Sequence, residues 1–180
     1  DAGSVAASDL NTIDTNSTPN VVATAATTIT GNHADITTAV SSGSITQASN
    51  VALTAADTMT SDELASMDAL TTGIITANIE DVAMTDLAAI ADANSNNALT
   101  ITVTDTSVAA AALNTLDGLT SVNVTATAAT AMTGTAAAIA TALSSTTIDH
   151  NATNITATVD AGSVAASDLN TIDSNSNNNV

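Results

Sequence analysis

Aspartate is the residue whose type and spacing could support chemistry in this chain. When four similar segments are aligned on a shared leucine, each ends in an aspartate, and three further aspartates lie near expected strand-to-helix junctions: Asp14, Asp68, Asp117 and Asp173, then Asp57, Asp105 and Asp160. Carboxylates stacked about 5 Å apart would repel one another by about 3 kcal/mol at an effective dielectric constant of about 20. The chain has 18 acidic residues and no Lys or Arg to offset them. Bridging Ca²⁺ would relieve this repulsion, because it binds carboxylate, Asn and backbone oxygens. The candidate calcium ligands are Asp14, Asp68, Asp105, Asp117, Asp160 and Asp173.

The same aspartates have a simpler interpretation as turn and helix-capping residues. Such residues need no metal if repeats of unequal length keep their charges apart and salt screens the remainder. The chain contains neither an EF-hand loop nor a glycine-rich calcium-binding repeat. Both interpretations stay open. We expect no required cofactor, with calcium as the one candidate ion.

Histidine supplies a second kind of candidate site. His33 and His150 lie at non-equivalent places in two long repeats. We expect both to be isolated surface residues rather than a catalytic or metal-binding pair. No serine–histidine–aspartate order, paired glutamate or phosphate-binding loop stands out, so we expect no enzymatic activity.

Threonine and asparagine offer surface candidates. Thr-rich alternating stretches could form a hydroxyl and methyl face that binds ice or polysaccharide, although threonine is favoured on any exposed strand. The threonines concerned are Thr100, Thr102, Thr104, Thr125, Thr127, Thr156 and Thr158. Asn-x-Ser/Thr sequences give four candidate glycosylation sites: Asn16, Asn123, Asn151 and Asn154.

The elements that would position these residues form an internal repeat. The sequence DAGSVAASDLNTID at residues 1–14 returns unchanged at residues 160–173. In such segments, apolar residues spaced five and then three apart predict a short helix with Ser or Thr near its start. The stretches before them alternate apolar and Thr residues, as in Leu99, Ile101 and Val103. This alternation predicts strands that recur about every 24 residues.

One strand, one short helix and two turns per unit predict an α/β solenoid with a parallel sheet and coils of about 24–32 residues. The alternative is an all-β parallel β-helix, in which the apparent helices are loops or strands. We expect residues 1–180 to form a single repeat array, either a window of a longer array or a subunit that stacks end to end. The expected coils are residues 1–20, 21–50, 51–74, 75–98, 99–122, 123–154 and 155–180. The two longest each carry an added segment, which would be a further short strand or a bulged loop.

The composition excludes several classes of partner. The formal charge is −18 and there are no aromatic residues, so the chain can neither neutralise phosphates nor stack on bases. Anionic membrane surfaces are excluded for the same reason, and no apolar run approaches the roughly 20 residues needed to span a bilayer. We therefore expect no nucleic-acid partner and no membrane insertion. The expected partner is the chain itself, end to end or laterally, with divalent cations or glycans as further candidates.

The stretch LNTLDGLTSVNVTATAATAMTGTAAAIATAL at residues 113–143 resembles units of the giant Thr/Ala/Asp-rich tandem-repeat proteins of the cell surface or filaments in marine cyanobacteria and other aquatic bacteria. Those proteins alternate an element of the LNTID type with one of the TLTGTAAD type. The second element is similar to MTGTAAA at residues 132–138 and ITGNHAD at residues 29–35. The resemblance implies an extracellular or cell-surface location and no enzymatic activity. We expect a structural segment of a filament, surface layer or stalk, with a calcium-dependent adhesin extender as the alternative.

Overall fold

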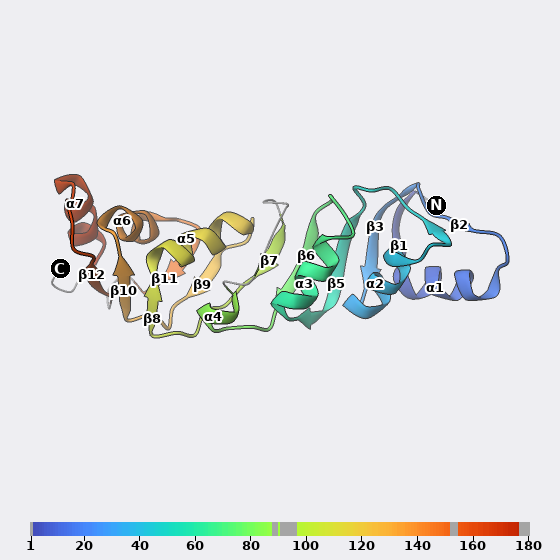
Figure 1. Ribbon diagram of the computed structural model, residues 1–180, viewed down its shortest axis with the longest axis horizontal. Helices are drawn as coiled ribbons and strands as arrows, with labels where there is room; N and C mark the ends of the chain where they lie inside the picture. The colour runs from blue at the N-terminus through green and yellow to red at the C-terminus, as the bar shows by residue number, and fades with distance from the viewer. Residues whose placement is uncertain (1, 88–89, 91–96, 152–154, 177–180) are drawn as a thin grey trace. The chain divides into compact units, whose positions relative to one another are not determined.

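The computed structural model describes residues 2–87, 90, 97–151 and 155–176 (Figure 1). In these residues, short strands alternate with short helices. The helices are α1 (Ala7–Asn16), α2 (His33–Ser41), α3 (Ser61–Asp68), α4 (Met84–Leu87), α5 (Ala110–Leu119), α6 (Ala136–Ser144) and α7 (Ala166–Asn175). The strands are β1 (Gly3–Ala6), β2 (Val21–Val22), β3 (Ala26–Gly31), β4 (Ile45–Thr46), β5 (Ala52–Met59), β6 (Ile75–Ile79), β7 (Ala98–Thr100), β8 (Ser107–Ala109), β9 (Val124–Ala126), β10 (Ala131–Gly134), β11 (Ile148–His150) and β12 (Thr156–Val159).

The strands of the described residues form four sheets. The largest has the order β1-β3-β5-β6-β7, the second has the order β12-β10-β8, and two small sheets pair β11 with β9 and β2 with β4. The strand pairs with a defined register are parallel. Ile29 of β3 lies beside Leu53 of β5, and Met132 of β10 lies beside Val108 of β8. Each of these pairs joins strands about one repeat apart in the sequence.

The predicted solenoid is wrong, and so is the all-β alternative. The described residues contain seven α-helices, which excludes a β-helix, and their strands do not join into one continuous sheet. One reason is that the added segments within residues 21–50 and 123–154 form β4 and β11. These strands pair with β2 and β9 and do not extend the larger sheets. The protein is a small α/β protein with several parallel sheets.

The chain divides into two compact units, residues 1–80 with 90–99 and residues 81–89 with 100–180. Each unit contains an equivalent pair of neighbouring helices, α1 with α2 and α5 with α6. In the first unit, Nδ2 of Asn11 donates to the carbonyl oxygen of Asp35 at 3.1 Å. In the second, Nδ2 of Asn114 donates to the carbonyl oxygen of Ala138 at 2.9 Å. The sequence repeat therefore reappears as a repeated tertiary contact.

Each unit has a core of aliphatic side chains. Ile29, Leu53 and Ile75 are fully buried in the first unit, as are Leu113 and Ile139 in the second. Alternate strand residues face away from the core, because successive side chains point to opposite faces of a sheet. Helices α5, α6 and α7 lie side by side in the second unit (Figure 1). No helix among the described residues is long and apolar enough to cross a membrane.

Candidate functional site

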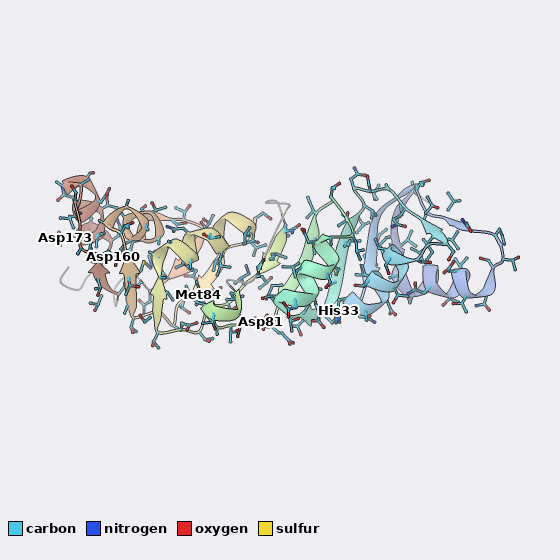
Figure 2. All side chains as sticks on the ribbon, viewed as in Figure 1. His33, Asp81, Met84, Asp160 and Asp173 are labelled. Carbon is cyan, nitrogen blue, oxygen red and sulfur yellow. The ribbon has the colours of Figure 1, made fainter. Side chains whose placement is uncertain are left out.

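His33, labelled in Figure 2, is the first residue of α2, and acidic residues bind both its backbone and its ring. Asn32 caps the helix, because its side chain accepts from the backbone N–H of Asp35 at 2.8 Å. This cap determines where the helix begins, and so it places His33 in the first turn. The backbone N–H of His33 has no partner within the helix and donates to Oδ1 of Asp57 in β5 at 2.8 Å.

The imidazole ring of His33 meets one carboxylate at each nitrogen. Nδ1 lies 2.8 Å from Oδ2 of Asp57, and Nε2 lies 3.0 Å from Oε1 of Glu63. An ionised carboxylate only accepts hydrogen bonds, so both contacts are satisfied when the ring carries two protons and is a cation. Glu63 also closes a capping box at the start of α3, where its Oε2 accepts from the backbone N–H of Thr60 at 2.8 Å. His33, Asp57 and Glu63 are termed the His33 clamp, since they join α2, β5 and α3.

The two carboxyl groups of the His33 clamp have lowered pKa values. For Asp57, burial acts to raise the pKa, but hydrogen bonds from the backbone and ring of His33 outweigh it and hold the pKa below its ordinary value of 3.8. For Glu63, the hydrogen bond from the backbone of Thr60 is the largest cause. It holds the pKa below its ordinary value of 4.5, opposed by burial and assisted by the charge of His33. Both groups therefore stay ionised further into acid than free side chains.

These pKa directions predict how the His33 clamp responds to acid. A carboxyl group with a lowered folded-state pKa stabilises the fold above its ordinary pKa, and this contribution is lost as the pH falls through the folded value. At neutral pH, Asp57→Asn should cost about 0.5–1 kcal/mol, a small value because the pair is partly exposed. The cost should shrink below pH 3.8 and disappear below the folded-state pKa of Asp57. Urea unfolding at a series of pH values measures it, with Asp149→Asn on an exposed position of β11 as the control. A cost independent of pH would contradict the ionised pair.

A shallow cavity of about 360 Å³ opens beside the His33 clamp and is lined by His33, Ala34, Thr37, Glu63 and Ser66. A catalytic base needs a ring nitrogen that is free to take a proton, whereas both nitrogens of His33 face carboxylates. The hydroxyl of Ser66 donates to the carbonyl oxygen of Asp62 within its own helix at 3.0 Å. The geometry therefore supports a role in joining elements more than a role in proton transfer.

The expectation that His33 is an isolated surface residue is wrong. Its side chain is 26% exposed and contacts two carboxylates. The separation of 24 residues between His33 and Asp57 is the spacing of paired strands, and this is the signal that the sequence carries. Glu63 has no such signal, because it reaches the ring from the capping box of α3. His150 ends β11 and is half-buried.

Asp14 and Asp117 make the same contact in the two units. Oδ2 of Asp14 accepts from the hydroxyl of Ser42 at 3.1 Å. Oδ2 of Asp117 accepts from the hydroxyls of Ser145 at 3.3 Å and Thr147 at 2.8 Å. In each unit, a carboxylate near the end of one helix therefore binds the residue that caps the end of the next. Both aspartates therefore have hydroxyl partners within the chain.

Asp105 holds the start of a helix that precedes it in the chain. Its Oδ2 accepts from the backbone N–H of Met84, the first residue of α4, at 2.8 Å. Asp57 does the same for α2 through His33. The first N–H groups of a helix have no partner within it and carry partial positive charge, so they stabilise a carboxylate. Both aspartates lie about one repeat beyond the helix that they cap.

The other candidate calcium ligands lie in different settings. Asp68 ends α3 and is buried, whereas Asp160 and Asp173 are exposed (Figure 2). In the part of the chain that the structure describes, no group of three or more His, Cys, Asp or Glu side chains is placed to hold a metal ion. Calcium binding by the six aspartates stays a prediction.

The candidate glycosylation sites are accessible where the structure describes them. Asn16, Asn123 and Asn151 are exposed, and Asn154 lies outside the described residues. The side chain of Asn16 donates to the carbonyl oxygen of Thr12 at 2.7 Å. Glycosylation stays a prediction.

The threonines that could form one binding face are divided among the sheets. Thr100 lies in β7, Thr125 in β9, and Thr156 and Thr158 in β12, which belong to three different sheets. Thr102 joins Thr125 through a single parallel bridge. The structure adds no observation that favours ice or polysaccharide binding.

The geometry offers two kinds of polar contact, a histidine held between two carboxylates and a repeated tie between aspartate and hydroxyl groups. The resemblance to giant surface proteins of aquatic bacteria rests on sequence pattern and stays a prediction. Comparison of the chain with protein-family models, with curated proteins and with solved structures found no match.

Proposed function

We propose that this chain is a non-enzymatic extracellular structural protein that forms part of a filament, surface layer or stalk. The observation that carries the proposal is the tie between neighbouring helices that recurs in both units, Asn11 to Asp35 and Asn114 to Ala138. A contact that recurs with the sequence repeat is typical of a protein built from regular units. An active site instead needs one local arrangement of different catalytic groups. The extracellular location is supported by the sequence resemblance alone.

The polar side chains of both units are consistent with this role. Asp14 and Asp117 tie the ends of neighbouring helices, and Asp57 and Asp105 cap helix starts. The His33 clamp adds a hydrogen-bonded link between α2, β5 and α3. These groups join elements that are distant in sequence.

We expect copies of the chain to associate with one another, and the net charge of the chain determines the salt concentration at which they do so. A formal charge of −18 makes copies repel one another at low salt. The Debye length falls from about 30 Å at 0.01 M to about 8 Å at 0.15 M ionic strength. Contact between copies is therefore favoured at moderate salt, with or without divalent cations.

Electron microscopy of the purified chain tests the proposal. At an ionic strength of about 0.15 M, where repulsion is screened, we expect regular filaments or sheets. Samples with calcium and with chelator at the same ionic strength should look alike, because Asp14, Asp105 and Asp117 already accept hydrogen bonds within the chain. Loss of the assemblies in chelator would assign calcium to the aspartates. Single thin particles in both samples would contradict the assembling role and favour an adhesin extender.

A further inference from the structure

The His33 clamp brings together two atoms of the kind that bind transition metals. Nε2 of His33 and Oε1 of Glu63 lie 3.0 Å apart, and both residues line the cavity of about 360 Å³. Imidazole nitrogen and carboxylate oxygen bind Zn²⁺ at about 2.0–2.2 Å. Two ligands at about 2.1 Å from one ion lie about 3.0 Å apart at an octahedral angle and about 3.4 Å apart at a tetrahedral angle. The observed separation therefore lies at the short end of the range that one ion requires.

The remaining polar atoms of the two side chains are already held by neighbours. Nδ1 of His33 lies 2.8 Å from Oδ2 of Asp57. An ionised carboxylate only accepts, so in a neutral ring this contact keeps the proton on Nδ1 and leaves the lone pair of Nε2 for a metal. Oε2 of Glu63 accepts from the backbone N–H of Thr60 at 2.8 Å and from its hydroxyl at 3.1 Å. Nε2 and Oε1 are therefore the atoms left for an ion.

The cavity beside the clamp gives an ion room for its other ligands. Within the described ranges of the chain, no three His, Cys, Asp or Glu side chains are placed to hold one metal ion. Asp57 and Glu63 contact opposite nitrogens of the ring, so the site offers two protein ligands. The cavity of about 360 Å³ has space for several waters of about 30 Å³ each, and Thr37 and Ser66 line it. Water therefore completes the coordination, as it does in open zinc sites.

We propose that His33 and Glu63 bind a divalent transition-metal ion, represented by Zn²⁺, and that Asp57 positions the imidazole ring. The ion takes the place of any proton on Nε2, and that proton passes to water. The charge of −18 raises the local concentration of cations around the chain. All three residues lie in the first unit, so the site needs no second copy and does not depend on the structural function.

Calcium and magnesium fit this pair of ligands poorly. Ca²⁺ takes about six to eight oxygen ligands at about 2.3–2.6 Å, and Mg²⁺ is also an oxygen-binding ion. Both ions carry the same charge as Zn²⁺ and screen the acidic residues to the same degree. They therefore serve as controls that separate coordination from charge screening.

Proton NMR can observe the site directly, because the chain has two histidines and no Phe, Tyr or Trp. In deuterium oxide, the ring C–H signals of His33 and His150 are therefore the only aromatic ring signals, and a His33→Gln chain assigns them. We expect Zn²⁺ to shift the His33 signals until they saturate, while Mg²⁺ at the same concentration leaves them in place. Unmoved His33 signals, or an equal shift with Mg²⁺, would overturn the proposal.

The two glutamates of the chain provide a matched pair of variants. Glu63→Gln should weaken Zn²⁺ binding about tenfold or more, since even the loss of an outer partner of a metal ligand has an effect of about this size. Glutamine can also occupy this position of a capping box, so α3 should stay folded. Glu80→Gln removes the same charge from an exposed residue and should leave the affinity unchanged. Calorimetric titration measures both affinities, and equal values would overturn Glu63 as a ligand.

Asp57→Asn tests the positioning role. The amide of asparagine can donate to Nδ1 of His33, which moves the ring proton to Nε2, where it blocks the metal. We expect Zn²⁺ binding to weaken about 10–100-fold. The carbon-13 signals of the ring report which nitrogen carries the proton, and a purely structural role of Asp57 would not move them. Unchanged affinity or an unchanged ring tautomer would contradict the positioning role.

Discussion

Gly73→Ala is expected to lower the free energy of unfolding by about 1–3 kcal/mol, toward the upper end of the range for overpacked sites. Gly73 lies in the turn between α3 and β6. A Cβ atom there would lie against the carbonyl oxygens of Asn50 and Val51, closer than van der Waals contact allows. Backbone atoms cannot move aside as a flexible side chain can, so the segment that leads into β5 must shift. Urea unfolding followed by circular dichroism measures the loss.

Gly118→Ala is the matched control, and it should act in the opposite direction. Gly118 lies within α5, and a Cβ atom there would meet nothing within 4 Å. Alanine is a better helix former than glycine and restricts the unfolded chain, so a gain of about 0.4–1 kcal/mol is expected. A loss of stability in both variants would contradict the assignment of the Gly73 effect to its close backbone contacts.

Leu113→Ala is expected to lower the free energy of unfolding by about 2–5 kcal/mol, because it leaves a cavity at a fully buried position of α5. The sequence around it, Ala-Leu-Asn-Thr, is close to the Asp-Leu-Asn-Thr around Leu169. Any difference between the two positions therefore comes from tertiary packing and not from local propensity. Chemical unfolding monitored by circular dichroism measures the free energy of each variant.

Leu169→Ala supplies the comparison within the same kind of helix. Leu169 is 38% exposed, so its truncation removes fewer buried contacts and should cost less than about 1 kcal/mol. The measurement needs dilute protein, where copies do not associate. Equal costs at the two positions would contradict the burial that distinguishes α5 from α7.

The local elements could be predicted from the sequence because their signals are local. In the segment that aligns Met59, Leu64 and Met67, the last two residues lie in α3 as expected, whereas Met59 ends β5, and all three side chains are buried. The added segments of the two long repeats form the short strands β4 and β11, one of the two outcomes expected for them. The division of the described strands among four sheets could not be predicted from the sequence. It depends on which strand each added segment pairs with, and apolar periodicity carries no information about that choice.

The candidate site, like the fold, could be predicted from the sequence only in part. The recurrence of aspartate at equivalent places in the sequence was visible, and the structure gives Asp14 and Asp117 equivalent partners. The His33 clamp was missed, because a histidine in a chain with so many acids has no unique partner by sequence. The N-cap at Asn32 and the capping box at Thr60 orient His33 and Glu63 toward each other, and this depends on three-dimensional placement.

The uncharged partners of the aspartates affect how the stability of the fold depends on salt concentration. Asp14, Asp105 and Asp117 accept hydrogen bonds from hydroxyl and peptide groups, which are uncharged dipoles. Added salt weakens the attraction between two exposed ions but has little effect on a short contact between a carboxylate and a dipole. The same salt screens the repulsion among the 18 acidic residues. Brine therefore weakens the charge repulsion that opposes folding while sparing these contacts.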